Sequence, residues 1–286
     1  MRRPVLCSLV ALATLVVAAP TAQAATTSQA ATLNYVALGD SYSSASGVQP
    51  ADPTAVSCTR SLVNYPRDIA AATGAQLTDV TCGAAKTQDY YSSQMTGVAP
   101  QLDALSTATQ LVTQTIGGND SNVFIDSIAE CGAAGLSTAG QGSPCKDQYG
   151  SSFVDTIKST TYPALVKALQ AVHAKAPNAR VAILGYPWIL PTTVGCFDKI
   201  PVATGDVPYL RNIQATLNDA VKRAAAATGS TYVNMNVVSE GHDACQPIGT
   251  RWIEPVLQGT NPVIVHPNAL GEQNMATQAM KVLGLR

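Results

Sequence analysis

Three short polar segments of the sequence carry the side chains that acyl transfer requires. They are Gly39-Asp40-Ser41, Gly117-Gly118-Asn119-Asp120 and Val265-His266-Pro267-Asn268. Acyl transfer needs a hydroxyl nucleophile, a base within hydrogen-bonding distance and donors for the oxyanion of a tetrahedral intermediate. Ser41 is the candidate nucleophile, His266 the candidate base and Asn119 a candidate oxyanion donor through its side-chain amide. Each segment alone is a weak signal, but the three together favour catalysis.

Each of these residues also has an ordinary structural explanation. Asp40 and Ser41 are both frequent helix caps, and Asn119 is a residue type that often stabilises turns. His266 by itself would be a hydrogen-bonded residue near the start of a helix. His242 is the second candidate base, although we favour a structural role for it in its loop. The third histidine of the sequence lies on a predicted helix and is expected to be solvated.

The remaining parts of an acyl-transfer site are expected from the backbone. The last helix of the chain is predicted over about 269–283, with Pro267 at its first helical position, so that it would fix the backbone of His266. The backbone N–H of Ser41 is a second candidate oxyanion donor. A third is expected from the turn Gly83-Ala84-Ala85, which follows a predicted strand.

Short apolar and β-branched runs alternate with helical patterns along the chain, which predicts a parallel sheet covered by helices on both faces. Such layering is a three-layer α/β/α sandwich. In open sheets of this kind, ligands bind beyond the carboxyl ends of the strands. Ser41, Gly83-Ala84, Asn119 and the loop after Tyr186 are therefore expected at one edge of the sheet. Strands are predicted at 33–38, 76–81, 110–116, 179–185 and 230–235.

The helical segments show a 3.6-residue apolar period. The segment 153–176 is helical in pattern, and Pro163 is expected to kink or restart it. The segments 131–150 and 188–208 are rich in Gly, Ser, Pro and Thr, and we predict that both are loops held by disulfides. One predicted helix face carries Leu62, Tyr65, Ile69 and Ala72, and another carries Leu210, Ile213, Leu217, Ala220, Val221 and Ala224.

The first 24 residues have the pattern of a secretory signal peptide, with Arg2 and Arg3 before an apolar stretch and small residues before the cleavage site. Cys7 lies inside that stretch and should leave with it. The apolar stretch is short for a membrane span, and no later segment reaches the length of one, so no integral membrane segment is expected. We predict an exported protein whose residues 25–286 form a single domain, with 25–31 as a loose N-terminus.

The formal net charge of −1 and the 12% of charged residues give no clustered basic surface, so nucleic acid is not expected as a partner. Six cysteines follow the predicted signal peptide, an even number in an exported chain, which predicts three disulfides. Fifteen pairings are possible. Sequential pairing, Cys58 with Cys82, Cys131 with Cys145 and Cys196 with Cys245, would close three loops between secondary elements. The spacing of CxxC or HExxH metal sites is absent.

The three polar segments, their order and their spacing resemble those of the GDSL, or SGNH, hydrolases, and most of all the exported actinobacterial lipases and esterases of that family. The resemblance covers nearly the whole predicted mature chain. It implies a flavodoxin-like sandwich, three disulfides, Ser41 as nucleophile and His266 as general base and then acid. It also implies an oxyanion hole made by Asn119 and the backbone N–H groups of Ser41 and Ala84.

Two positions depart from the family pattern. Ala84 stands where the family usually has glycine; a backbone donor tolerates alanine if the local φ and ψ do not need glycine, and Gly83 is the fallback. Val263 stands where many members have an aspartate that orients the histidine. We therefore predict a Ser-His dyad in which the carbonyl of Val263 or Ile264 holds the imidazole, while Glu254 and Asn261 do not.

The sequence thus predicts a secreted, monomeric serine ester hydrolase that needs no cofactor or metal and cleaves carboxylic esters, with lipids as the expected substrates. One alternative is removal of acetyl groups from a polysaccharide, which needs the same residues and differs in the shape of the cleft. An alternative of another class is a secreted binding protein on the same fold whose site is inactive.

Overall fold

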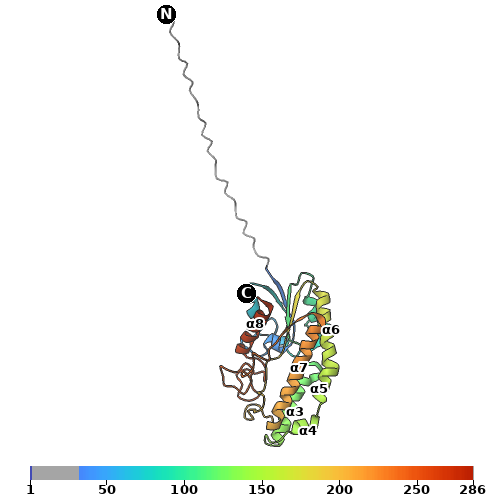
Figure 1. The fold of residues 1–286 in the computed structure, drawn as a ribbon, viewed down its shortest axis with the longest axis vertical. Helices are drawn as coiled ribbons and strands as arrows, with labels where there is room; N and C mark the ends of the chain where they lie inside the picture. Colours follow the sequence, from blue (N-terminus) through green and yellow to red (C-terminus); the bar gives the residue numbers. More distant parts are fainter. Residues whose placement is uncertain (2–31, 286) are drawn as a thin grey trace. The chain divides into compact units, whose positions relative to one another are not determined.

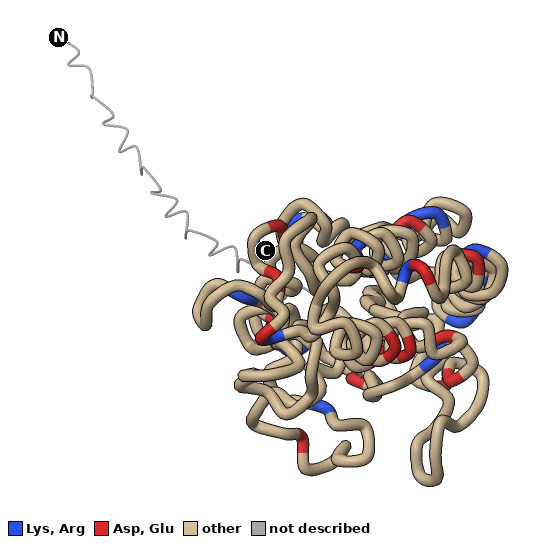
Figure 2. The backbone as a smooth tube through the Cα atoms, turned by 90° about the horizontal axis from the view of Figure 1, so that it is seen from below, with Lys and Arg blue, Asp and Glu red and all other residues tan. Residues whose placement is uncertain are grey.

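The computed structural model describes Met1 and residues 32–285. The predicted signal peptide and the predicted loose segment 25–31 lie outside the described residues, apart from Met1. No helix within the described ranges is long and apolar enough to cross a membrane. Figure 2 shows basic and acidic positions interspersed along the described chain, in keeping with a net charge of −1.

A five-stranded parallel sheet lies at the centre of the described residues, with strand order β2-β1-β3-β4-β5. This is the flavodoxin-like order, so the predicted fold class is confirmed. All five predicted strands are present, although shorter than expected. β2, for example, ends at Asp79, although the N–H groups of Val80 and Cys82 still bond to the carbonyls of Ala37 and Gly39. The strands are β1 (Asn34–Ala37), β2 (Gln76–Asp79), β3 (Leu111–Gln114), β4 (Arg180–Leu184) and β5 (Thr231–Val233).

Helices cover both faces of the sheet. Figure 1 shows α6 and α7 on one side of the strands and α8 on the other; α2 packs against α8 and α6 against α7. This is the predicted three-layer arrangement. The helices are α1 (Ser41–Ser44), α2 (Tyr65–Thr73), α3 (Val123–Ser137), α4 (Pro144–Tyr149), α5 (Ser152–Thr156), α6 (Tyr162–Lys175), α7 (Val207–Thr228) and α8 (Ala269–Leu283).

The predicted face of α7 is confirmed, since all six of its apolar residues from Leu210 to Ala224 are buried. The face predicted for 62–72 is partly wrong. The side chain of Asn64 caps α2 by accepting from the N–H of Arg67, so the helix begins at Tyr65 and leaves Leu62 outside it and exposed. Ala72 lies within α2 but is exposed too, so only Tyr65 and Ile69 of the predicted face are buried. A cap next to a proline in the first turn fixes a helix start more strongly than an apolar residue upstream.

The long helical segment restarts at Pro163, as predicted. α5 passes into a π turn at Ile157–Thr161, and Pro163 then lies in the first turn of α6. Proline has no N–H to donate to the preceding turn, so the change of helix type occurs where the missing hydrogen bond falls.

The prediction of a loop at 131–150 is wrong, whereas most of 188–208 is irregular as expected. Cys131 lies within α3 and Cys145 within α4, and a disulfide joins them. The glycines of α3 serve packing rather than flexibility, because a Cβ on Gly135 would lie 2.3 Å from the carbonyl oxygen of Pro201. The other disulfides are Cys58–Cys82 and Cys196–Cys245, so the structure has the sequential pairing.

Candidate active site

The carboxyl ends of β1, β2 and β3 open into one cleft of about 490 Å³. Ser41, Ala84, Asn119 and His266 all line it, although they come from four distant parts of the sequence. The loop after Tyr186 does not line this cleft: Ile189 and Leu190 face a neighbouring cavity instead. The structure therefore brings together the predicted site residues but not the fourth predicted loop.

The two polar residues of the turn after β1, Asp40 and Ser41, make different contacts. The carboxylate of Asp40 caps α1 by accepting from the N–H of Tyr42 (3.0 Å), and it also accepts from the hydroxyl of Thr115 (2.7 Å). Ser41 is the first residue of α1, and its side chain points away from these contacts to reach His266. Capping is thus the role of Asp40, and the hydroxyl of Ser41 remains available.

The imidazole of His266 lies between a hydroxyl and a carbonyl. Its Nε2 is 2.7 Å from Oγ of Ser41, and its Nδ1 is 2.7 Å from the carbonyl oxygen of Ile264. A carbonyl only accepts hydrogen bonds, so Nδ1 carries the proton and Nε2 is left to accept from Ser41. Burial lowers the pKa of His266 to about 4, although the Ile264 carbonyl acts in the opposite direction. The ring is therefore a neutral base near pH 7.

The predicted position of Pro267 within the last helix is wrong. α8 begins at Ala269, because the side chain of Asn268 caps it by accepting from the N–H of Gly271 (3.0 Å). Pro267 precedes the cap, and His266 lies on a loop rather than at the helix start. Three backbone hydrogen bonds hold this loop: Glu254 N–H to the His266 carbonyl (2.9 Å), Val265 N–H to the Glu254 carbonyl (3.0 Å) and Asn268 N–H to the Trp252 carbonyl (2.8 Å).

A buried ion pair stands behind the histidine loop. Arg251 lies 2.7 Å from the carboxylate of Glu254, which also accepts from the side-chain amide of Asn268 (2.8 Å) and from the N–H of Thr260 (2.6 Å). Burial acts to raise the pKa of Glu254, but the hydrogen bonds from Arg251 and Asn268 outweigh it and lower the pKa. Glu254 makes no hydrogen bond to the imidazole among the described residues, so its role is to anchor the loop.

The backbone of the turn Gly83-Ala84-Ala85 differs from the expectation. Ala84 has φ +61°, in the left-handed region that favours glycine, so this position does carry backbone strain. Gly83 cannot be the fallback donor, because its N–H already bonds to the carbonyl of Cys58 (2.8 Å). The N–H groups of Ser41 and Ala84 have no acceptor among the described residues and lie in the cleft wall.

Asn119 reaches the cleft from the loop after β3. One hydrogen of its amide bonds to the carbonyl of Ala85 (3.0 Å), which fixes the side chain. An amide nitrogen carries two hydrogens, so one remains to donate to a substrate oxygen. The contact with Ala85 also ties the turn Gly83-Ala84-Ala85 to the segment that carries Asn119.

Tyr186 is a residue of the site that the sequence did not single out. Its hydroxyl donates to the carboxylate of Asp40 (2.6 Å) and accepts from the N–H of Gly118 (2.9 Å). The tyrosine thereby joins the nucleophile turn to the loop that carries Asn119. Gly118 is needed at this point, because a Cβ there would lie 3.1 Å from the phenol ring. The only sequence signal was the position of Tyr186 after a strand.

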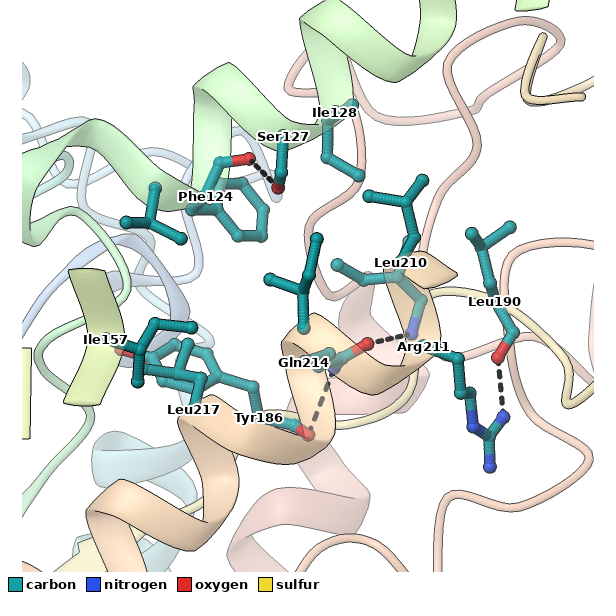
Figure 3. A pocket seen from close by; sticks show the side chains of 13 residues that line it. Phe124, Ser127, Ile128, Ile157, Tyr186, Leu190, Leu210, Arg211, Gln214 and Leu217 are labelled. Atoms are coloured by element: carbon teal, nitrogen blue, oxygen red, sulfur yellow. Dashed lines mark hydrogen bonds between the residues drawn. The ribbon is translucent and has the colours of Figure 1, made fainter. Parts of the chain in front are cut away.

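Apolar surfaces flank the polar centre of the cleft. The ring of Phe124 packs edge-on against His266, with centroids 5.7 Å apart, and also lines an enclosed cavity of about 30 Å³. Figure 3 shows this cavity between α3 and α7, with Phe124, Leu210 and Leu217 in its wall. On the other side, Ile125 borders both the cleft and an open groove of about 290 Å³ whose walls are almost entirely aliphatic.

The other two histidines have structural contacts. Nδ1 of His242 is 2.7 Å from the carbonyl of Thr250, and its ring stacks on Trp252 at 4.4 Å. His173 was expected to be solvated, but it is half-buried and pairs with the hydroxyl of Ser230 (2.9 Å). Among the described residues, no group of His, Cys, Asp and Glu side chains could hold a metal ion.

A flavodoxin-like sandwich with a serine hydroxyl, an imidazole and free N–H groups at its carboxyl edge has the features of the serine-dependent hydrolases. Comparison with known proteins narrows this class. A profile of the GDSL-like lipase/acylhydrolase family matches residues 37–273. The chain is 63% identical to Lipase 2 of Streptomyces coelicolor over 255 residues, which cover 88% of this chain and 86% of that protein.

Solved structures agree with the sequence comparison. The crystal structure of phospholipase A1 from Streptomyces albidoflavus superposes with a TM-score of 0.72 and 30% identity, over 89% of this chain and 99% of that one. The structure of an extracellular lipase from Streptomyces rimosus superposes with a TM-score of 0.72 and 29% identity, over 88% of this chain and 98% of that one. The chain belongs to the GDSL-like lipase/acylhydrolase family. It is a carboxylic ester hydrolase of the lipase and esterase class.

Proposed function

We propose that this protein is an exported hydrolase of lipid carboxylic esters that uses Ser41 and His266 as a catalytic dyad. The observation that carries the proposal is the 2.7 Å contact between Oγ of Ser41 and Nε2 of His266, with Nδ1 held by a carbonyl. In this arrangement the unprotonated Nε2 of the neutral imidazole faces the serine hydroxyl, so it can accept the proton of the nucleophile.

The reaction proceeds in two halves. His266 accepts the proton of Ser41 while Oγ attacks the acyl carbonyl, and the resulting oxyanion receives hydrogen bonds from the N–H groups of Ser41 and Ala84 and from the amide of Asn119. Protonated His266 then gives its proton to the departing alcohol, which leaves an acyl-enzyme on Ser41. In the second half, His266 deprotonates a water molecule that attacks the acyl carbon; the bond from that carbon to Oγ of Ser41 then breaks, the protonated His266 returns the proton to Oγ, and the acid is released.

The carbonyl of Ile264 takes the place of the acidic member of a catalytic triad. Its hydrogen bond fixes the tautomer and the orientation of the ring. A neutral carbonyl stabilises the imidazolium less than a carboxylate does, but it can be buried without a charge of its own. Among the described residues, no carboxylate is hydrogen-bonded to the imidazole, whose two ring nitrogens pair with the Ile264 carbonyl and the Ser41 hydroxyl.

The apolar surroundings of the cleft support lipid esters as substrates. Phe124 and Ile125 border the polar centre, and an aliphatic groove of about 290 Å³ continues from Ile125. Burial of each methylene of an acyl chain contributes about 0.8 kcal/mol, and an acetyl group would leave such a groove unused. The lipase and phospholipase names of the relatives agree with this choice.

Export of the protein, with residues 25–286 as one domain that acts as a monomer, also belongs to this proposal. Three disulfides are typical of proteins that mature in an oxidising compartment. The Streptomyces rimosus relative is described as extracellular. N-terminal sequencing of the protein from culture medium tests the predicted cleavage after residue 24.

Two measurements on the oxidised protein test the chemistry. A fluorophosphonate probe should label the wild type and Ser44→Ala, which removes a hydroxyl from the same short helix, but not Ser41→Ala. Hydrolysis of p-nitrophenyl esters from acetate to palmitate should require Ser41 and favour the longer chains. Activity confined to acetyl esters and acetylated xylan would support the polysaccharide esterase instead. A folded wild type with neither labelling nor turnover would indicate an inactive binding protein.

A further inference from the structure

The residue before His266 has an unusual backbone conformation. Val265 has φ +53° and is only 1% exposed. A β-branched residue in the left-handed region is a genuine outlier, because this conformation places its Cβ too close to the following carbonyl oxygen. Such a conformation persists only where the surrounding structure imposes it.

The conformation of Val265 decides whether the imidazole is oriented. Val265 is the single residue between Ile264, whose carbonyl accepts the hydrogen bond, and His266, whose Nδ1 donates it. A change of φ to the ordinary negative range would turn the Ile264 carbonyl and the imidazole away from each other. The strained residue therefore maintains the contact that replaces the triad carboxylate.

Three hydrogen bonds hold this segment in place. Two are the backbone bonds with Glu254, which fix the N–H of Val265 and the carbonyl of His266. The third fixes the peptide group between Val265 and His266: the hydroxyl of Tyr42 donates to the Val265 carbonyl at 2.7 Å. No other described group donates to that carbonyl.

Tyr42 is well placed to act as a rigid support. It follows Ser41 in α1 and is 1% exposed, and its ring packs edge-on against Phe124 and Tyr186. Its centroid is 5.1 Å from that of His266. Burial raises the pKa of Tyr42 well above its usual value, so the hydroxyl remains a donor over the working pH range.

We propose that Tyr42 is a positioning residue of the dyad: its hydroxyl holds Val265 in the left-handed conformation and thereby keeps His266 aimed at Ser41. This inference rests on the proposed function of Ser41 and His266. The residue beside the nucleophile would then also align the base, through one backbone carbonyl.

The first test is Tyr42→Phe, which removes only the hydroxyl. We expect kcat to fall about tenfold, the worth of one hydrogen bond, with KM changed by less than about twofold because no substrate contact is lost. Tyr35→Phe is the matched control: it removes another buried hydroxyl, which pairs with Thr113 far from the cleft. It should lower Tm by a similar amount without lowering kcat.

A rescue experiment separates positioning from simple loss of packing. Glycine at position 265 would adopt the left-handed conformation without strain. Tyr42→Phe in a Val265→Gly background should therefore lower kcat by less than about threefold. Val265→Ala also removes side-chain volume but keeps the Cβ that causes the strain. In that background the full tenfold loss should remain.

Each result bears on the role of Tyr42. Full kcat in Tyr42→Phe, or equal losses in the Val265→Gly and Val265→Ala backgrounds, would overturn it while leaving the Ser41 and His266 proposal intact. A loss of kcat in Tyr35→Phe as large as in Tyr42→Phe would mean that the effect is general destabilisation. Absence of turnover by the wild type would refute the dyad itself, and the role of Tyr42 with it.

Discussion

The turn after β1 that carries Ser41 (the nucleophile turn) and the loop before α8 that carries His266 (the histidine loop) meet at one hydrogen bond. The two segments are held in place in different ways. Ser41 follows β1 directly, and the N–H of Asp40 bonds to the backbone of Thr115 beyond β3, so the sheet itself positions the hydroxyl. His266 lies near the end of a long segment, 234–268, that contains no helix and no strand of the sheet. There the Arg251–Glu254 ion pair and a left-handed Val265 set the geometry.

The difference shows that the sheet supports one half of the site, whereas a segment without regular structure supports the other. Strand hydrogen bonds are distributed over many residues, and the carboxylate of Asp40 adds contacts with Thr115 and Tyr186, so the position of Ser41 has many supports. The histidine loop depends on a few polar groups, each of which leaves a buried partner unsatisfied when removed. Substitutions around the two halves should therefore differ in their effects.

The largest effect is expected from substitution of the two reacting groups, and the loss of kcat should be the same for both. Ser41→Ala and His266→Ala should each lower kcat by about 10⁶, and the double variant should lose no more, because the pair acts as a unit. Single-turnover rates with a p-nitrophenyl ester measure this. Losses that multiply in the double variant would contradict a shared role.

Removal of Glu254 tests the dependence of the His266 loop on single side chains. Glu254→Ala leaves Arg251 buried without its partner, which should lower the free energy of unfolding by about 3–5 kcal/mol, measured by urea unfolding. Glu240→Ala is the control, since Glu240 is half-exposed in its pair with Arg211 and its removal should change stability by less than about 1 kcal/mol. A small effect at Glu254 would mean that the loop does not depend on the ion pair. We also expect kcat to fall, because Glu254 anchors the loop that carries His266.

Asn119 tests the oxyanion donors on the nucleophile side. Asn119→Ala should lower kcat by about 10² to 10³ with little change of KM, the usual loss for one donor. Asn119→Asp keeps the size but places a negative charge where the oxyanion forms, so its loss should be larger. A loss near 10⁶ for the alanine variant would mean that Asn119 also holds the nucleophile in place.

The pH dependence reports the burial of the base. Since burial lowers the pKa of His266 to about 4, the neutral ring should persist well below pH 6.5. The value of kcat/KM should stay flat from neutral pH to about pH 5 and fall about tenfold per unit below pH 4. Circular dichroism at each pH separates this from unfolding. A tenfold fall per unit with a midpoint near 6.5 would mean that the His266 ring is open to water, whereas a smaller fall that levels off would report Asp40, the cap of α1, whose pKa burial raises to about 6.

The smallest effect is expected at Ala84, the strained position on the nucleophile side. Ala84→Gly should raise the free energy of unfolding by up to about 1 kcal/mol, because glycine adopts a positive φ without the steric penalty. Activity should be kept, since the donor is a backbone N–H. The control Ala85→Gly lies at an ordinary φ and should lower stability by about 1 kcal/mol. Loss of stability at Ala84 would contradict the strain.

The same contrast explains what the sequence could predict. The sheet and the buried face of α7 follow from local periodicity, and Ser41 is marked by the strand before it. Glu254 and Tyr42 act through contacts with residues distant in the sequence, which no local pattern reveals. The glycines of α3 were misleading for a similar reason: Gly135 is required by the backbone of Pro201, which crosses the helix.

Ser41 and His266 are 225 residues apart in the sequence. In a chain made from its N-terminus, the turn that carries Ser41 and the last strand of the sheet, which ends at Val233, are therefore both made before residue 266. Under the proposed mechanism, any product that ends before residue 266 lacks the base, so its serine hydroxyl would have ordinary reactivity. Truncated chains would then be inert toward the esters of the cell that makes them.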